Sequence, residues 1–263
     1  MDYLKEFERK MSIKYAESTK RTYLEIIKLF LRKYPEPKNC TVAQIEEYLL
    51  LHKSSSRHRQ VRGLLQYFFT VVFDQAFKFK HIPYPPKAQQ LPKVIDQTFL
   101  IKSIEAIPNL KHKCILSLAY GCGLRLSEIL NLTVADIDSQ RMVVIIKQGK
   151  GKKDRQTMLP DPLLHNLRKY YSQYRPKNFL FEGQFGGRYS KKSVQSIVKQ
   201  YLGAQYHTHQ LRHSFATHLH ESGIDIKDIK ELLGHQNIKT TEIYTHVSTK
   251  HISKIKSPLE MAV

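Results

Sequence analysis

Residues 207–219 of the chain have the sequence HTHQLRHSFATHL, in which two groups that can bind an anion lie on one side of a predicted helix. The helix is expected over residues 208–222, and Gly223 follows at the position where a glycine commonly ends a helix. His209 and Arg212 are three residues apart, so their side chains project from the same face. Together they could hold one phosphate.

This pair alone does not decide a function, because charged residues at helical spacing usually lie on a solvent-exposed face. His213 stands four residues after His209, which is the spacing of the histidines in HExxH zinc sites. The glutamate that follows the first histidine in those sites is missing here, so we expect no metal. We expect a simpler role in helix packing for His213, Phe215, Ala216 and Leu219.

Three further segments carry cationic or proton-transferring side chains. They are residues 121–128 (GCGLRLSE), 149–151 (GKG) and 234–244 (GHQNIKTTEIY), which contain Arg125, Glu128, Lys150, His235 and Tyr244. Lys150 lies at the tip of a predicted hairpin, but the segment is no nucleotide-binding P-loop, because Gly151 follows the lysine where Ser or Thr would be needed.

Around these segments the sequence predicts a mainly α-helical domain with a small antiparallel β-sheet. Two β-rich stretches, residues 141–147 (RMVVIIK) and 155–159 (RQTML), flank the turn GKGKKD. Helical patterns occupy the remainder, at residues 97–131, 162–175, 190–202, 208–222 and 225–233.

The N-terminal residues predict a helical bundle without strands. Apolar residues recur with helical period over residues 18–34 and 56–73, and a capping-box pattern at Thr41 starts another helix between them. Four prolines then follow within ten positions, which favours extended chain. The expected organisation is a helical domain at 1–80, a linker at 81–96, a second domain at 97–248 and a tail at 249–263.

The composition indicates a folded protein with a polyanionic partner. Apolar residues make up 41% and charged residues 25%, while 43 Lys and Arg against 23 Asp and Glu leave a net charge of +20. The most apolar stretch, residues 64–73, is too short to span a bilayer, and residues 1–11 contain no apolar signal-peptide core. Three cysteines without a CxxC pair fit a reducing compartment. We expect a cytoplasmic protein without a membrane partner.

Basic residues gather in the first turns of the helix predicted at 56–73. They are Arg57, His58, Arg59 and Arg62. We assign the three arginines to the side of the N-terminal domain that faces the polyanionic partner, with an ordinary solvated helix end as the alternative.

The combination of segments, in this order, strongly resembles the tyrosine recombinase family, the phage-integrase and Xer-type site-specific DNA recombinases. Residues 118–132 (LAYGCGLRLSEILNL) match the box around the family's first catalytic arginine, and residues 207–219 match the second box. Residues 232–246 (LLGHQNIKTTEIYTH) match the segment with the nucleophilic tyrosine, and residues 149–155 (GKGKKDR) match the hairpin with the catalytic lysine. The resemblance covers residues 92–248, and the helices at 1–80 resemble in pattern the family's core-binding domain, a SAM-like domain that binds DNA.

The resemblance implies a role for each matching residue. Arg125 and Arg212 would clamp the nonbridging oxygens of the scissile phosphate, for which the planar guanidinium is suited. Lys150 would protonate the departing 5′ oxygen, and His209 would assist the proton of the nucleophile Tyr244. His235 would hydrogen-bond the phosphate, and Glu128 would support the site.

The chemistry of these residue types agrees with the implied roles. A free tyrosine has a pKa of about 10, so Tyr244 needs surrounding cations or a base to attack at neutral pH. The arginines, lysine and histidines would supply that field and stabilise the charge of the transition state. Near these motifs the sequence has no Asp/Glu cluster with the spacing of a two-metal nuclease. We therefore expect no cofactor, neither metal nor ATP.

The resemblance also implies an assembly. Two domains would close as a C-shaped clamp on double-stranded DNA, and four protomers would exchange strands through a Holliday junction. Accessory DNA-bending proteins would be further partners, and residues 249–263 would pass to a neighbouring protomer. Three alternatives remain open: a type IB topoisomerase, a non-catalytic DNA-binding regulator, and a protein that coats a membrane surface or another polyanion.

Overall fold

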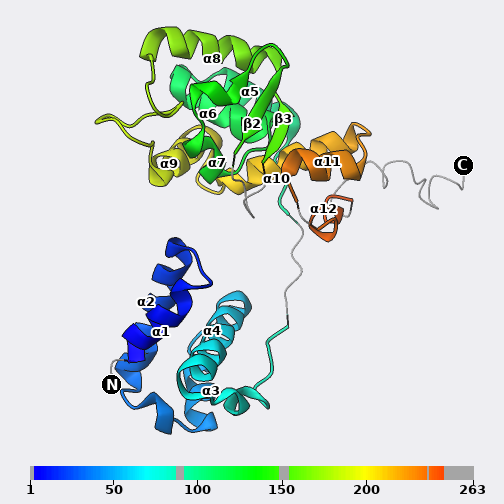
Figure 1. The fold of residues 1–263 in the computed structure, drawn as a ribbon. Coiled ribbons are helices and arrows are strands. Elements are labelled where there is room, and N and C mark those ends of the chain that lie inside the picture. Colours follow the sequence, from blue (N-terminus) through cyan, green and yellow to red (C-terminus); the bar gives the residue numbers. More distant parts are fainter. Residues whose placement is uncertain (1–2, 87–91, 148–153, 236, 246–263) are drawn as a thin grey trace, which may run out of the picture. The chain divides into compact units, whose positions relative to one another are not determined.

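The computed structural model describes residues 3–86, 92–147, 154–235 and 237–245, and the chain divides into two compact units, residues 1–90 and 91–263 (Figure 1). Each unit has its own hydrophobic core. Within the described residues, no helix is long and apolar enough to cross a membrane.

The first unit is a bundle of α-helices. They are α1 (Tyr3–Ser12), α2 (Glu17–Lys33), α3 (Val42–Leu50) and α4 (Ser55–Phe73), with short 3-10 turns at Pro37–Asn39 and Ala76–Phe79. The three predicted helices are present, and the capping box of Thr41 and Gln44 forms at the start of α3. Helix α1 was not predicted. Its buried Phe7 and Met11, four residues apart, are the signal that could have shown it.

Arg62 belongs to the core of this unit. Its side chain is 5% exposed, and its guanidinium donates to the carbonyl oxygens of Ile82 (Nε, 2.8 Å) and Phe79 (3.0 Å). The ring of Tyr84 lies 3.7 Å from the guanidinium carbon. Arg62 therefore fastens residues 79–84 to α4. The expected DNA-facing position of Arg62 is wrong. Its side chain lies on the buried, apolar face of the helix, and its N–H groups donate hydrogen bonds to backbone carbonyls.

The second unit combines helices with a small sheet, as predicted. Its strands are β1 (Ile137–Asp138), β2 (Val143–Ile146) and β3 (Arg155–Met158), antiparallel in the order β1-β2-β3, with Val144 opposite Thr157. The helices are α5 (Gln97–Glu105), α6 (Leu110–Gly121), α7 (Leu126–Asn131), α8 (Asp161–Tyr174), α9 (Lys191–Leu202), α10 (Thr208–Glu221), α11 (Ile226–Leu233) and α12 (Lys239–Glu242). The short strand β1 was not predicted.

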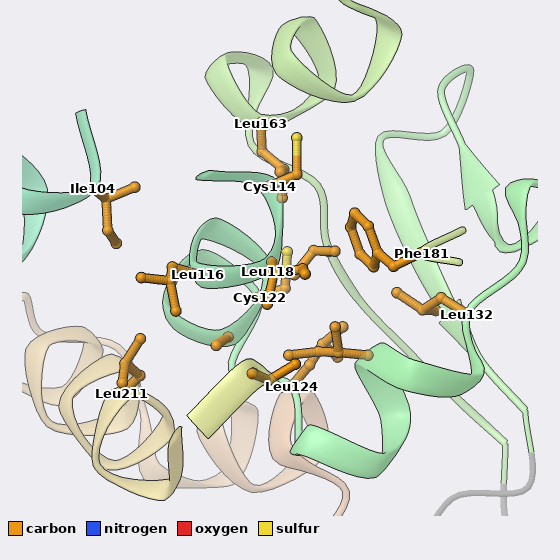
Figure 2. Packing of buried hydrophobic residues seen from close by; sticks show 14 of the residues in the cluster. Ile104, Cys114, Leu116, Leu118, Cys122, Leu124, Leu132, Leu163, Phe181 and Leu211 are labelled. Atoms are coloured by element: carbon orange, nitrogen blue, oxygen red, sulfur yellow. The ribbon is translucent and has the colours of Figure 1, made fainter. Parts of the chain in front are cut away.

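Helix α6 lies at the centre of the second unit's main core. Figure 2 shows its Cys114, Leu116 and Leu118 among side chains from several other elements. Both cysteines of this region, Cys114 and Cys122, are buried free thiols. Burial raises the pKa of the Cys114 thiol to about 12, so this cysteine packs as an apolar residue.

A smaller core joins α10, α11 and the chain after α12. It consists of Phe215, Ala216, Ile229, Leu233 and Tyr244. Gly123, in the turn before α7, packs against Phe215 with a positive φ of 61°, and a Cβ there would lie 2.4 Å from the ring. Only glycine fits this position. The turn that presents Arg125 is thereby held against the helix that carries Arg212.

Candidate active site

Residues from three separate segments line one cavity of about 390 Å³ in the second unit. They include Arg125 from the start of α7, His209, Arg212 and His213 from α10, and His235 and Tyr244 from the C-terminal segment. Every residue predicted to be catalytic is among them except Lys150, which lies outside the described residues. The cavity therefore gathers side chains that are up to 119 positions apart in the sequence.

Glu128 is the buried anion around which the arginines are arranged. It accepts hydrogen bonds from the backbone N–H of Arg125 (2.8 Å) and from the Arg125 guanidinium (2.7 Å). Arg155 donates to both of its carboxylate oxygens at 2.8 Å, and Arg212 lies 3.8 Å away. Burial by itself would raise the pKa of Glu128, but the hydrogen bonds and charges of Arg155 and Arg125 lower it to about 2. Its supporting role in catalysis stays a prediction, and these contacts show that it holds two of the arginines.

Arg155 is a site residue that the sequence reasoning missed. Besides its two bonds to Glu128, its Nε donates to the carbonyl oxygen of Leu232 at 2.9 Å, and its side chain packs against Gly234. One side chain thus joins β3, α7 and the end of α11. Its place in the quoted GKGKKDR segment, five residues after Lys150, was the available signal.

Arg212 is almost fully buried, with 1% of its surface exposed. Its guanidinium donates to the carbonyl oxygens of Gly123 and Leu233. Burial and the charge of Arg125 lower the pKa of Arg212 to about 9, which leaves it charged at neutral pH. The two carbonyls fix the direction of its remaining donors at the cavity wall, so the charge is positioned before any ligand arrives.

Tyr244 lines the cavity but is 1% exposed, because its ring belongs to the smaller core. Its hydroxyl lies 3.0 Å from Nδ1 of His213. Burial raises the pKa of Tyr244 to about 12, although the charges of Arg212 and Arg125 act in the opposite direction. The expected activation by cations is therefore outweighed in the free protein, and the phenol stays protonated at neutral pH.

The cavity histidines are neutral at neutral pH. Burial, followed by the charges of Arg212 and Arg125, lowers the pKa of His235 to about 3, and its Nδ1 lies 2.9 Å from the Thr241 hydroxyl. Burial and the charge of Arg212 also lower the pKa of His209. Within the described segments, no group of three His, Cys, Asp or Glu residues is arranged to hold a metal ion. Among the described residues that line the cavity, the side chains charged at neutral pH are the arginines.

Arg57 and Arg59 of the first unit are half-buried near the start of α4. Arg57 donates to the side chain of Gln60 at 2.9 Å. Arg59 donates to the Pro85 carbonyl oxygen at 2.7 Å and lies over the Tyr84 ring. Their role in DNA binding stays a prediction, now without Arg62.

Changing Arg57 and Arg59 together to Ala is expected to weaken DNA binding regardless of sequence. Each lost phosphate contact should flatten the plot of log K against log salt by about one unit. Arg62→Met is the matched control: it should lower the free energy of unfolding without changing the slope. Binding titrations at several salt concentrations measure this. An unchanged slope in the double variant would place both arginines off the DNA.

Arg155→Gln is expected to lower the free energy of unfolding at neutral pH by about 3 kcal/mol, because it leaves the buried Glu128 without its main partner. The pKa of Glu128 should then rise, so its protonation at acid pH removes a buried charge that has lost its bidentate partner. The difference in unfolding free energy between the variant and the wild type should therefore be smaller at acid pH. Urea unfolding at neutral and acid pH measures this. The double variant with Glu128→Gln should recover part of the loss; strictly additive losses would contradict a coupled pair.

Comparison with known proteins decides the family. The family model described as "Phage integrase family" matches residues 93–251, which include every cavity residue named above. The chain belongs to this family. The curated relatives of the chain include proteins named tyrosine recombinase, so the resemblance inferred from the four motifs is confirmed.

Two of the curated relatives show how far the similarity extends. The putative integrase/recombinase y4qK of Sinorhizobium fredii is 34% identical over 261 residues, covering 94% of this chain and 84% of that protein. Tyrosine recombinase XerA of Pyrococcus horikoshii is 40% identical over 200 residues, covering 73% of this chain and 69% of that protein.

The fold is similar to that of a recombinase solved on DNA. XerH site-specific recombinase, bound to its palindromic difH substrate in a post-cleavage complex, has a TM-score of 0.69 at 23% identity. The match covers 88% of this chain and 76% of that one. The mainly helical fold with a small antiparallel sheet is therefore the fold of this family.

Proposed function

We propose that this chain is a site-specific recombinase that cleaves and rejoins double-stranded DNA through Tyr244. The single observation that carries the proposal is the cavity that Tyr244 lines together with Arg125, Arg212 and His235. Family membership and the DNA-bound relative XerH support the choice of DNA as substrate.

In the proposed reaction, Tyr244 Oη forms a bond to the scissile phosphorus while the bond to the 5′ oxygen breaks. Arg125 and Arg212 hold the nonbridging oxygens, where negative charge grows in the transition state. Lys150 gives the 5′ oxygen its proton, and His235 donates a hydrogen bond to the phosphate. The product is a 3′-phosphotyrosine and a free 5′ hydroxyl. Because the phosphodiester energy is kept in that linkage, a hydroxyl of another strand can reverse the step.

The larger assembly is proposed on the same family basis. The two units would close as a C-shaped clamp on DNA, and a tetramer would pass through a Holliday junction in integration, excision or resolution. Accessory DNA-bending proteins would assist, and the protein would act in the cytoplasm. The reaction would need neither metal nor ATP.

The test begins with finding the DNA site. Protein incubated with sheared DNA of its own host is denatured with detergent, and fragments joined to protein are isolated and sequenced. A duplex with the recovered site, nicked beside the cleavage point, should then trap the protein on a denaturing gel, also in excess EDTA. Relaxation of any supercoiled plasmid without strand exchange would favour a topoisomerase. DNA binding without any covalent product would favour a non-catalytic DNA-binding regulator.

The tail at residues 249–263 lies outside the described residues, and its exchange between protomers stays a proposal. Deleting these residues is expected to leave DNA binding by single protomers intact while reducing strand exchange, since a head-to-tail contact would close a ring of protomers. Gel-shift and recombination assays on two copies of the site measure both. Exchange at the full-length rate by the truncated protein would show that the tail does not link protomers.

A further inference from the structure

The nucleophile's hydroxyl already has a partner in the free protein, and it is His213. Nδ1 of His213 lies 3.0 Å from Tyr244 Oη, and the two ring centroids are 5.6 Å apart. His209, one turn earlier on α10, instead packs edge-on against the His213 ring at 4.3 Å between centroids. The family resemblance implied that His209 assists the tyrosine proton, and the sequence predicted only helix packing for His213.

We propose that His213, and not His209, accepts the proton of the Tyr244 hydroxyl when this tyrosine attacks the phosphate. The inference rests on the proposed function, since it names the base for that reaction. His213 touches the reacting oxygen itself and is therefore a catalytic residue in this scheme.

Both partners are held in place before DNA binds. His213 directly follows Arg212, whose guanidinium is fixed by two backbone carbonyls. The Tyr244 ring is packed in the smaller core with Phe215 and Leu233, so its hydroxyl has little freedom to leave Nδ1. A base within hydrogen-bond reach of the proton it removes is the first requirement of general base catalysis.

The proton balance of the step is simple. With its own proton on Nε2, neutral His213 accepts the Tyr244 proton at Nδ1 and becomes an imidazolium as the oxygen–phosphorus bond forms. The leaving 5′ oxygen takes its proton from Lys150. When the strand is rejoined, the imidazolium returns its proton to the tyrosine oxygen, which is now the leaving group.

The surroundings of His213 keep its ring neutral, which is the form that can accept a proton. Burial lowers its pKa to about 4, and nearby groups add to this effect. The charged and titratable groups beside it on α10 and across the cavity are His207, His209, Arg212, Arg125, His235 and Tyr244. In the free protein the proton stays on the tyrosine, whose pKa is about 12. A bound phosphate would offset the charge of Arg212 and raise the pKa of His213, which favours its protonated form.

The experiment compares His213→Asn with His209→Asn on a nicked duplex whose scissile 5′ oxygen is replaced by sulfur. A thiolate leaves without an acid, so the rate of trapping reports on the nucleophile. Asn at 213 can still accept the hydroxyl's hydrogen bond but takes no proton; its trapping rate should fall at least about 100-fold at saturating DNA. In the wild type the trapping rate should fall at low pH, where the base becomes protonated; we call this fall the acidic limb of the pH profile. His213→Asn should lose it. His209→Asn should keep that limb and lose less.

A second measurement separates proton transfer from positioning. A ring-trifluorinated tyrosine at position 244 has a more acidic phenol, so it needs a base less. It should restore much of the rate of His213→Asn and little of that of His209→Asn. Thermal unfolding and DNA affinity of each variant exclude a folding defect as the cause.

Two results would overturn the inference while the proposed function stands. One is trapping by His213→Asn at the wild-type rate, and the other is loss of the acidic limb in His209→Asn alone. If the wild-type protein itself forms no covalent product on the recovered site, the proposed function fails instead.

Discussion

Tyr244→Phe is expected to abolish covalent capture of DNA while leaving DNA affinity nearly unchanged. The ring is buried with Phe215 and Leu233, and phenylalanine fills the same space, so the fold persists. The variant lacks the hydrogen bond between the tyrosine hydroxyl and His213, which should lower the free energy of unfolding by about 1 kcal/mol. The nicked duplex on a denaturing gel measures capture, and a gel shift measures affinity.

The matched control for this variant is Tyr120→Phe. Tyr120 also packs beside this core, and its hydroxyl lies 2.9 Å from Nδ1 of His218, away from the residues that line the cavity. It should lose a similar amount of stability and still be captured. Capture of Tyr244→Phe at the wild-type rate would show that another residue is the nucleophile.

The helices and the residues that meet at the cavity could be predicted because their signals are local. Turn glycines, capping residues and apolar periods lie within a few positions of each other, and each short motif carries its own functional side chain. The boundaries of α4, α10 and α11 differ from the predicted ones by about one residue for this reason.

What the sequence could not show depends on burial and on contacts across long separations. Arg62 looks like its neighbours Arg57 and Arg59 in the sequence, yet only Arg62 continues the apolar face and reaches the carbonyls of residues 79 and 82. The bidentate pairing of Arg155 with Glu128 spans 27 positions. His213 was assigned to packing because the approach of Tyr244, 31 positions later, has no local signal.

The pKa of Tyr244 could not be predicted from the sequence either, because it also depends on burial. The motif predicts cations around Tyr244, and Arg125 and Arg212 do lower its pKa, but burial in the core raises it more. A sequence reports which charges are present, whereas the cost of removing a phenolate from water depends on how completely the ring is enclosed.

Arg212→Lys is the second large effect we expect, and it should reduce the trapping rate at saturating DNA by about 100- to 1000-fold, as for the loss of one preorganised donor in an oxyanion hole. A guanidinium can serve the carbonyls of Gly123 and Leu233 and still direct N–H groups at a phosphate. A lysine ammonium has three donors on a flexible stem, and two would be taken by those carbonyls.

Arg125→Lys is the control that separates position from charge. Arg125 is a cavity cation too, but its side chain is 21% exposed and its guanidinium is held by the single carboxylate of Glu128. Lysine can replace that contact more easily, so Arg125→Lys should lose less trapping and less stability than Arg212→Lys. Urea unfolding alongside the trapping assay measures both losses. If Arg212→Lys cleaves at the wild-type rate, a positive charge alone suffices at this position. The fixed direction of the guanidinium would then add nothing to the stabilisation of the transition state.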